Sequence, residues 1–317
     1  MTGMPGGRGS CGASGRQTAG NIVYTEKSCV RKSADSDFYL KTFFMTDKTK
    51  QSVQKTGGSH GRGCAGMWEM PRCSVVIPAY RCEAYIEGCI RSVQRQTVAD
   101  IEILVVDDCS PDNTAEIVME HAKSDGRIRY IKQERNQGVA AARNRGVQEA
   151  RSEWIAFLDS DDVWQSDKLE RQFALQTSAG ADLIYAAAWC MDSADRLTGR
   201  IFFAPKSVDY KSLLKGNDIV CSSVLVRREW MLKYPMERRD LHEDYLCWLR
   251  LLKDGCIAAG IEEPMVRYRL TKGSKSRDKL KAAMMTWGTL KATRIPFMKR
   301  CGYFLAYAAH GMRRYLA

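Results

Sequence analysis

The chain has 317 residues, 44% of them hydrophobic, and a formal net charge of +12. This length allows one large domain or two small ones with an ample core. The 12 cysteines form no C-x-x-C pair, which argues against zinc and dithiol redox sites and favours buried thiols in a reducing compartment. The longest run without a charge, residues 301–312, is shorter than the roughly 20 residues that span a bilayer.

The charge is unevenly distributed. Residues 71–266 carry 26 Lys and Arg against 31 Asp and Glu, whereas residues 267–317 carry 13 against one. A basic tail suits an anionic partner such as a membrane surface, a lipid diphosphate or nucleic acid. The mildly acidic middle argues against nucleic acid binding in a cleft there, so no nucleic-acid partner is expected.

Residues 1–70 hold 12 of the 25 glycines and show no sustained apolar period. This composition predicts a mostly disordered extension, or sequence upstream of a true start at Met67 or Met70. No apolar run follows a basic start, so no secretory signal is expected.

Strands and helices are predicted to alternate from Pro71 onward. The first strand is expected to stop at Pro78. Apolar runs predict strands at residues 73–80, 101–106, 127–132 and 154–158, and helical spacing predicts helices at residues 83–96, 114–123 and 138–150. Such alternation predicts βαβ units and a parallel sheet.

The second half continues with mixed elements. Helices are predicted at residues 168–178, 210–215 and from His242, and strands at residues 181–187, 219–226 and 264–270. Residues 191–203 predict a turn between strands. Residues 277–314 predict two basic helices separated near Pro296.

One apolar strand ends in an acidic cluster. Residues 154–158 are followed by Asp159, Asp161 and Asp162, a charge density that is costly beside a buried strand unless a cation offsets it. Mg²⁺ typically binds one or two carboxylates together with substrate phosphates. The cluster therefore predicts a metal–diphosphate site, with a solvated acidic turn that caps the next helix as the alternative.

Other polar candidates also follow predicted strands, and the carboxyl ends of parallel strands meet at one edge of a sheet. Tyr80 could stack on a base, Asp108 could accept a hydrogen bond from a base or ribose, and Arg143 could offset phosphate charge. Each one alone is also compatible with packing, a loop cap or a solvated helix face.

Five motifs in order carry a resemblance to a known family: S-V-V-I-P-A-Y, V-V-D-D-C-S-x-D-N-T, N-x-G-V-A-A-A-R-N, F-L-D-S-D-D and H-E-D-Y. Over residues 71–270 this succession resembles the inverting family 2 glycosyltransferases of bacterial polysaccharide biosynthesis. The resemblance implies an α/β GT-A fold, Rossmann-like, with a mostly parallel sheet flanked by helices. Residues 271–317 would then form a basic helical C-terminal segment.

The resemblance also implies roles for individual residues. In the family, the first two motifs hold a nucleotide sugar, and the D-x-D motif contacts ribose and binds Mg²⁺ or Mn²⁺. The register of the metal ligands stays open, because Asp159, Asp161 and Asp162 all qualify. The nucleotide-sugar contacts that the resemblance implies are Pro78, Tyr80, Asp107, Asp108, Arg143, Asp159 and Ser160.

The last motif supplies the family's catalytic base, which falls on Asp244 with Glu243 beside it. A helix N-cap is the alternative for this segment. Arg269 and Lys275 are candidate diphosphate contacts, because a Tyr-Arg pair and a Ser-rich segment resemble those near the family's diphosphate. The histidine common in that segment is absent, and Thr271 and Lys272 stand in its place.

The expected function is inverting, metal-dependent transfer of a sugar from a nucleotide diphosphate sugar to a saccharide or lipid-linked saccharide. UDP is expected as carrier by family precedent alone. A non-catalytic nucleotide-sugar-binding protein and a sugar-1-phosphate nucleotidyltransferase are the alternatives, although residues 78–82 lack the glycine-rich loop of the latter. Residues 297–317 mix aromatic and basic side chains, which predicts a cytoplasmic protein attached peripherally to the inner face of the membrane, or a helix packed on the sheet.

Overall fold

The computed structural model describes residues 70–237, 241–270 and 279–316. Contacts divide the chain into residues 1–63 and residues 64–317, and every described residue belongs to the second unit. The expected disordered extension lies outside the described residues, apart from Met70.

The first half of the second unit alternates strands and helices as predicted. Its elements are β1 (Cys73–Ala79), α1 (Ile86–Gln94), β2 (Ile101–Asp107), α2 (Thr114–Ser124), β3 (Ile128–Lys132), α3 (Val139–Glu149) and β4 (Trp154–Phe157). Strands β1, β2, β3 and β4 are all parallel, in the order β3-β2-β1-β4. The predicted parallel sheet is therefore confirmed in this half.

The second half extends the same sheet. Its elements are β5 (Val163–Trp164), α4 (Lys168–Ala179), β6 (Leu183–Met191), β7 (Leu197–Phe202), β8 (Ser207–Val208), α5 (Tyr210–Leu213), η1 (Cys221–Ser223), β9 (Leu225–Arg227), α6 (Arg228–Lys233), α7 (Glu243–Lys253) and β10 (Ala258–Arg269). The sheet continues as β4-β9-β6-β10-β5, in which β6 and β10 are parallel and β9 and β5 run antiparallel to their neighbours. The mostly parallel α/β architecture was correctly predicted.

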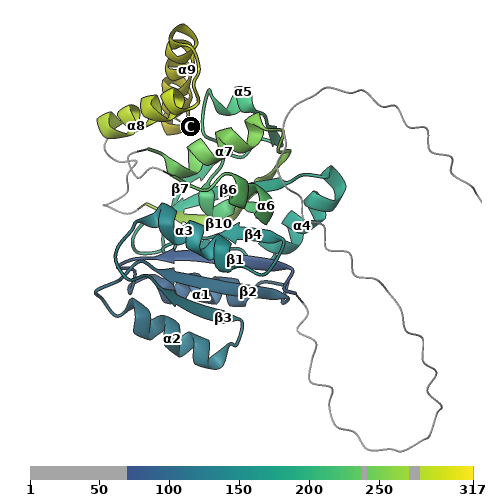
Figure 1. The fold of residues 1–317 in the computed structure, drawn as a ribbon, viewed down its shortest axis with the longest axis vertical. Helices are drawn as coiled ribbons and strands as arrows, with labels where there is room; N and C mark the ends of the chain where they lie inside the picture. Colours follow the sequence, from purple (N-terminus) through teal and green to yellow (C-terminus); the bar gives the residue numbers. More distant parts are fainter. Residues whose placement is uncertain (1–69, 238–240, 271–278, 317) are drawn as a thin grey trace, which may run out of the picture. The chain divides into compact units, whose positions relative to one another are not determined.

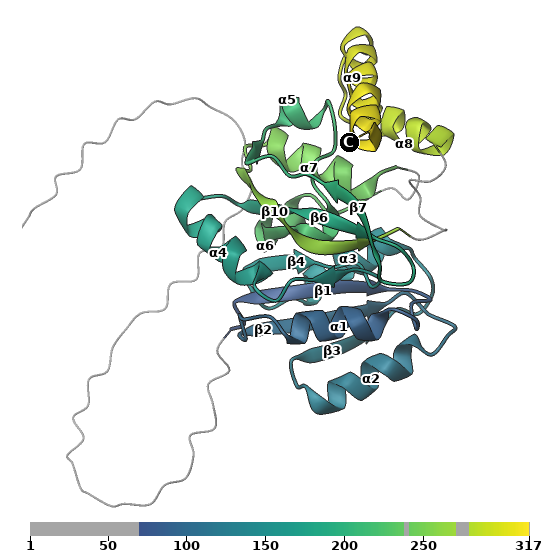
Figure 2. The same ribbon diagram turned by 180° about the vertical axis from the view of Figure 1, so that it is seen from behind.

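Alternate side chains of the central strands belong to two hydrophobic clusters, one on each face of the sheet. On one face Val75 and Ile103 pack with Ile86 of α1. On the other face Val76 and Leu104 pack with Val147 of α3. Helix α3 is in front in Figure 1, whereas α1 is in front in the reverse view of Figure 2. Each fully buried aliphatic side chain contributes about 1.5–3 kcal/mol, and this burial fixes the strand ends rigidly.

The register brings the ends of three strands together. Ala79 pairs with Asp107, and the main-chain N–H of Asp108 donates to Ala79 O at 2.8 Å. The N–H of Leu158, just after β4, donates to Val76 O at 3.1 Å. Polar residues that follow β1, β2 and β4 therefore share one edge of the sheet.

Strand β1 continues through Pro78 to Ala79, so the expected stop at Pro78 is wrong. The main-chain polar groups of Pro78 point to the same edge of β1 as those of Val76, which is the edge that faces β4. Strand β4 pairs only with residues 74–76 of β1. Because β4 has already ended, no hydrogen bond is lost to the missing N–H of the proline.

The predicted strand at residues 219–226 is wrong in its first part. A turn of 3-10 helix, η1, stands there, and only β9 is extended. Ser223 Oγ donates to Val220 O at 2.7 Å and accepts the N–H of Ala186 at 3.1 Å. This local bonding competes with a strand ladder, although all three residues of η1 are as buried as a strand would be.

Two helices, α8 (Lys279–Ala292) and α9 (Phe297–Leu316), follow the sheet and are separated at Pro296 as predicted. Figure 1 shows them at one end of the molecule, beyond α7. Tyr307 of α9 packs against Tyr245 of α7, with the ring centroids 5.6 Å apart. Within the described residues, no helix combines the length and the apolar content needed to cross a membrane.

Candidate active site

A cavity of about 490 Å³ opens at the edge of the sheet where β1, β2 and β4 end. The start of α3, the start of α7 and the end of β10 complete its walls. The lining residues are Pro78, Ala79, Tyr80, Asp108, Asn136, Gly138, Val139, Ala140, Ala142, Asp159, Ser160, Asp161, Glu243, Tyr268 and Arg269. Most of the predicted site residues are thus brought together in one hollow.

The predicted nucleotide end of this cavity has an exposed aromatic ring and a buried carboxylate. Tyr80 is 42% exposed and lines the cavity, with the guanidinium of Arg81 5.4 Å from the centre of its ring. Asp108 is buried, and its oxygens accept from the side chain of Gln133 and the main-chain N–H groups of Gln137 and Gly138, each at 2.6 Å. Asp108 therefore holds the loop that leads into α3.

Gly138 is the N-cap of α3 and has φ +89°, a conformation that other residues rarely adopt. With Asp108 on its N–H, this glycine sets the first turn of α3 at the cavity wall. The sequence showed the glycine inside a motif but gave no sign that Asp108 would be bonded to it.

Asp107 lies outside this cavity. Its side chain is fully buried, with Oδ1 accepting the N–H of Ser110 at 2.9 Å and Oδ2 accepting the hydroxyl of Tyr130 at 2.6 Å. Both oxygens are thus used within the fold, and the structure does not bring Asp107 to the other predicted nucleotide-sugar contacts.

The acidic loop after β4, residues 159–162, is fixed by main-chain hydrogen bonds. The N–H of Asp159 donates to Ser222 Oγ at 3.1 Å, and the N–H of Asp162 donates to Asp159 O at 3.0 Å. Burial, followed by the charge of Asp159, raises the pKa of Asp161 to about 6. The loop therefore carries more negative charge than its own surroundings compensate.

Asp162 faces away from the cavity and into the fold. It is 1% exposed, and Oδ1 accepts the main-chain N–H of Arg269 at 2.8 Å. Burial raises its pKa well above the usual value, and Asp161 and Asp159 add to the effect. Asp161 lines the cavity and Asp162 does not. Of these two aspartates, Asp161 is therefore the better candidate for the metal ligand.

Arg143 links the acidic loop to the start of α7. It is buried at 4% exposure, Nη2 donates to Asp159 Oδ1 at 2.6 Å, and Nη1 donates to Glu243 Oε1 at 3.3 Å. Arg143 does not line the cavity, and its guanidinium forms ion pairs with both carboxylates. The expectation that Arg143 offsets phosphate charge stays a prediction, and any such effect would act through Asp159 and Glu243.

Arg269 is also committed to the protein. Its side chain is 4% exposed; Nε donates to Asp161 O at 2.7 Å, Nη1 donates to Asp192 O at 3.1 Å, and Nη2 pairs with Asp195 at 2.6 Å. The guanidinium thus supports the acidic loop through Asp161 O, while Arg269 also lines the cavity. Its expected contact with diphosphate stays a prediction. Lys275, the other expected contact, lies outside the described residues.

The two carboxylates at the start of α7 have different surroundings. Glu243 is buried, lines the cavity and is paired with Arg143. Asp244 is partly exposed, and its Oδ1 accepts the N–H of Tyr245 at 2.7 Å. Burial raises the pKa of Asp244, the charge of Glu243 raises it further, and the charges of Arg143 and His242 oppose the effect.

The donor set suits a hard divalent cation that shares its ligands with a substrate. No group of three or more His, Cys, Asp or Glu side chains among the described residues forms a complete metal cage. Mg²⁺ and Mn²⁺ need only one or two carboxylates when diphosphate oxygens supply the remaining ligands. Asp161, together with Asp159, fits that requirement.

Ser222 is a site residue that the sequence did not reveal. It is fully buried, its hydroxyl supports Asp159, and its carbonyl accepts the indole N–H of Trp164 at 2.7 Å. Ser222 therefore bonds to the residue at the start of the acidic loop, Asp159, and to Trp164, which follows the loop in β5. No sequence signal marked it, because a serine within an apolar run has no distinctive spacing.

Comparison with known proteins identifies the family. A family model described as glycosyl transferase family 2 matches residues 74–233. TuaG of Bacillus subtilis (strain 168), which carries the name "Putative teichuronic acid biosynthesis glycosyltransferase", is 35% identical over 247 residues, which are 78% of this chain and 98% of TuaG. WfgD of Escherichia coli, named as a UDP-Glc:alpha-D-GlcNAc-diphosphoundecaprenol beta-1,3-glucosyltransferase, is 35% identical over 246 residues, which are 76% of this chain and 94% of WfgD.

Among solved structures, S. aureus TarS 1–349 in complex with UDP-GlcNAc is similar with a TM-score of 0.58 and 18% sequence identity. The similarity covers 74% of this chain and 70% of that chain, and it shows the shared fold. Together with the family match and the two relatives, it confirms the expected fold and family. The chain belongs to glycosyltransferase family 2 and is a glycosyltransferase.

Proposed function

We propose that this glycosyltransferase moves a sugar from a UDP-sugar to a saccharide hydroxyl, with inversion at the anomeric carbon and with a divalent cation. The observation that carries the proposal is the convergence of Tyr80, Asp161 and Glu243 at one cavity. Asp244 does not line this cavity, but it follows Glu243 in the first turn of α7. Inverting transfer needs a base on the acceptor side of the sugar and charge stabilisation on the diphosphate side. The cavity has residues suited to both needs.

Donor binding follows from the walls of the cavity. The exposed ring of Tyr80 can stack on the base, and the loop held by Asp108 closes beside it. Asp161 and Asp159 would hold Mg²⁺ or Mn²⁺, which when bound offsets the charge of the diphosphate. Arg143 keeps Asp159 in place, and Arg269 keeps the main chain of Asp161 in place.

Asp244 is the base in this proposal. Its pKa is raised, so its carboxylate takes a proton from an acceptor hydroxyl more readily than an ordinary aspartate would. Glu243 is less suitable because its carboxylate is already paired with the buried guanidinium of Arg143. Glu243 instead fixes the start of α7, on which Asp244 stands.

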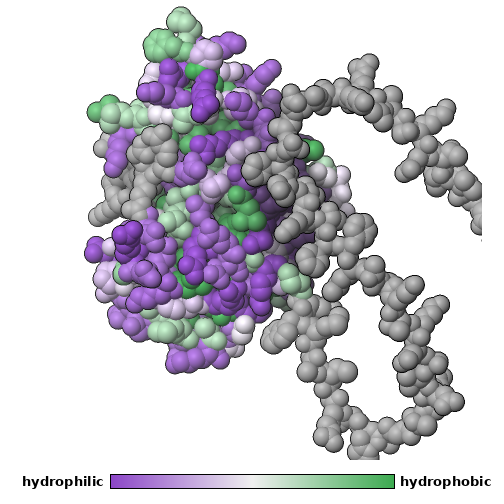
Figure 3. Space-filling view, in the orientation of Figure 1, coloured by the Kyte–Doolittle hydropathy of each residue, from purple (hydrophilic) through white to green (hydrophobic). Residues whose placement is uncertain are grey.

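The acceptor is proposed to be a saccharide linked to a lipid diphosphate. WfgD, whose name gives GlcNAc-diphosphoundecaprenol as its acceptor, aligns with most of this chain. One face of α9 packs on the protein through Tyr307, while Met298, Leu305 and Met312 are 79%, 69% and 61% exposed on another. Figure 3 shows hydrophobic and hydrophilic groups interleaved at this end of the molecule. Such a surface suits peripheral attachment to an anionic membrane.

The function is tested by UDP release. Purified protein should release UDP from a UDP-sugar in the presence of Mn²⁺ and a lipid-linked saccharide, and a chelator should stop the reaction. Binding of UDP-sugar without turnover, with every acceptor class tested, would favour the non-catalytic alternative. Release of diphosphate from a nucleoside triphosphate and a sugar phosphate would instead indicate a nucleotidyltransferase. The stereochemistry of the product, read by NMR, decides whether the transfer inverts.

A further inference from the structure

A second hollow, of about 700 Å³, lies along α8 and is separate from the sheet-edge cavity. Its lining combines apolar side chains, among them Leu241, Met284 and Trp287, with basic ones, among them Lys291 and Arg294. Residues 279–317 contain no Asp or Glu. The hollow, called the α8 groove below, is therefore suited to a ligand that is anionic at one end and apolar at the other.

The α8 groove adjoins the proposed catalytic base. Leu241 lines it, and three residues later the chain reaches Asp244. The ring of His242 lies with Nε2 3.4 Å from the carbonyl oxygen of Ala282, so α8 rests directly on this segment. Three residues of chain span at most about 11 Å, a distance that a short saccharide can bridge.

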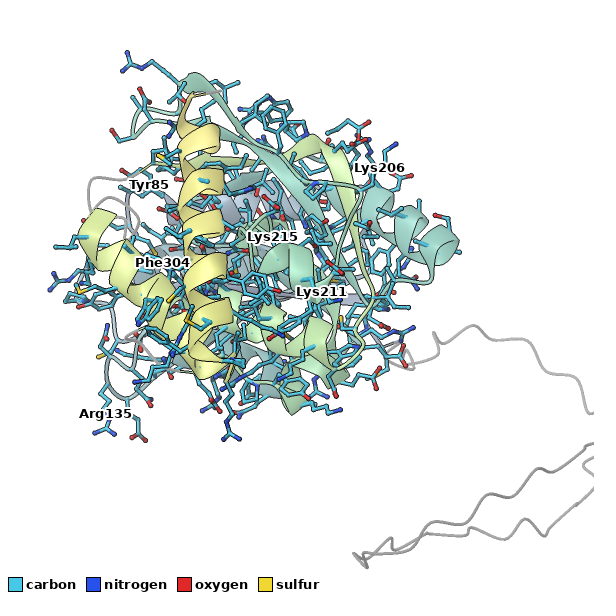
Figure 4. All side chains as sticks on the ribbon, turned by 90° about the horizontal axis from the view of Figure 1, so that it is seen from above. Tyr85, Arg135, Lys206, Lys211, Lys215 and Phe304 are labelled. Carbon is cyan, nitrogen blue, oxygen red and sulfur yellow. The ribbon has the colours of Figure 1, made fainter. Side chains whose placement is uncertain are left out.

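The wall of the α8 groove is held in place by α9. Trp287 has edge contacts with the rings of Phe297 and Phe304, at 6.1 and 5.5 Å between centroids. The guanidinium of Arg300 lies 4.8 Å from the centre of the Trp287 ring. Figure 4 labels Phe304 on the flank of α9 that faces α8. The groove is thus a preformed surface, which lowers the entropic cost of binding.

We infer that the α8 groove binds the lipid-diphosphate part of the acceptor. This inference rests on the proposed function, because it assigns a subsite to the proposed lipid-linked acceptor. Lys291 and Arg294 pair with the diphosphate, and Met284 and Trp287 contact the first units of the lipid chain. The saccharide then extends past Leu241 and presents its hydroxyl to Asp244.

Direct binding tests the groove independently of turnover. The probe is farnesyl diphosphate with the full chain in EDTA, where the carboxylates of the sheet-edge cavity repel diphosphate. The variant Lys291→Ala/Arg294→Ala should raise the Kd for this probe at least tenfold. The matched control is Lys211→Ala/Lys215→Ala, two exposed lysines labelled across α9 from α8 in Figure 4, which should leave the Kd unchanged. Equal loss in both variants overturns the inference.

The probe's parts identify the ligand chemistry. Farnesol and inorganic diphosphate should each bind at least tenfold more weakly than farnesyl diphosphate, because each lacks one half of the contacts. If inorganic diphosphate binds as tightly, the groove is a simple anion site and the inference fails. If vesicles of phosphatidylglycerol displace the probe at equal lipid concentration, the groove recognises phospholipid and the inference fails likewise.

Kinetics separate this inference from the proposed function. In Lys291→Ala/Arg294→Ala, the KM for a lipid-diphosphate-linked saccharide should rise at least tenfold. The KM for the octyl glycoside of the same saccharide, and hydrolysis of the UDP-sugar without acceptor, should stay unchanged. Similar KM changes for both acceptors count against the groove. Failure of the wild type to turn over any UDP-sugar counts against the proposed function, while the binding measurement still decides the groove.

Discussion

Arg143 Nη2 donates to Asp159 Oδ1 at 2.6 Å, and through this bond the acidic loop after β4 is tied to a helix on one face of the sheet. The second terminal nitrogen of the same guanidinium reaches Glu243, next to the proposed base. Burial opposes the charge of Arg143, but Asp159, Glu243 and Asp244 outweigh it and raise its pKa. One buried cation therefore sets the spacing between the donor end and the acceptor end of the cavity.

Replacement of this cation should uncouple the two ends. In Arg143→Lys the single ammonium cannot form two divergent hydrogen bonds, and we expect kcat/KM to fall by about 10–100-fold. In Arg143→Met the buried Glu243 and the partly exposed Asp159 both lose their partner, and we expect about 3 kcal/mol of destabilisation by chemical denaturation. Arg145→Lys is the control, because Arg145 is exposed and forms a surface pair with Glu149. Wild-type kcat/KM in Arg143→Lys would argue against this coupling role.

Asp244→Asn should remove the base and keep the fold. We expect turnover to fall by about 10²–10⁴-fold, with the Kd for UDP within a factor of about two of the wild type. Because the pKa of Asp244 is raised, wild-type kcat/KM should decline as pH falls through a value above that of a free aspartate. This acid limb should be absent from the residual activity of the variant. An unchanged acid limb in Asp244→Asn would assign it to another group.

Asp161→Asn tests the cation. The pKa of Asp161, raised to about 6 by burial and by Asp159, indicates that its charge is costly when no cation is bound. We therefore expect the metal-free variant to melt at roughly 2–4 °C higher for each kcal/mol of repulsion relieved. We also expect Mn²⁺ to lose its effect on the Kd for UDP. Asp167→Asn, at an N-cap without a side-chain bond, is the control. Undiminished Mn²⁺ dependence in Asp161→Asn would move the cation elsewhere.

Periodicity predicted the parallel sheet and the sheet-edge site well, for a physical reason. Strands such as β1 and β2 are buried along their whole length, so their sequences are mostly apolar, with Ser74 and Glu102 near their starts as the buried exceptions. Parallel pairing then requires Tyr80, Asp108 and Asp159 to meet at one edge. These placements depend only on strand direction and burial.

The roles of individual side chains were harder to predict, because they depend on partners far along the chain. Arg143 and Glu243 are 100 residues apart, and Arg269 and Asp162 are 107 apart. Both arginines were expected near phosphate, and the sequence did not show that they would also bond to carboxylates and main chain within the fold. A sequence pattern shows that a charge is present, but only the fold shows which opposite charge lies within hydrogen-bond distance.

The exposed apolar stripe on α9, formed by Met298, Leu305 and Met312, should mediate membrane attachment. Substitution of all three residues by Ser should lower binding to vesicles with anionic lipid at least tenfold, because their apolar area stays in water. A flotation assay measures this. The control replaces three other exposed apolar residues, Leu197, Leu232 and Ile257, by Ser. Equal vesicle binding by both triple variants would refute the assignment. Deletion of α9 is a poor test, because it exposes the core beside Tyr245.

Lys168 is fully buried, and burial lowers its pKa to about 7, with Cys73 opposing the effect slightly. Its Nζ donates to Gln172 Oε1 at 2.6 Å and lies 3.9 Å from the centre of the Trp164 ring. Between pH 7 and pH 10 the unfolded chain therefore binds one proton more than the folded chain, so the contribution of this group to stability rises with pH.

The comparison of wild type with Lys168→Met isolates this effect, since methionine does not titrate. The free energy of unfolding of the wild type, relative to that of the variant, should increase by about 2 kcal/mol from pH 7 to pH 9 in urea titrations. Lys123→Met, at an exposed lysine on α2, should show no such pH dependence. A constant difference between wild type and Lys168→Met would mean that the buried amine keeps one protonation state over this range. Its hydrogen bond to Gln172 would then stabilise the helix equally at every pH tested.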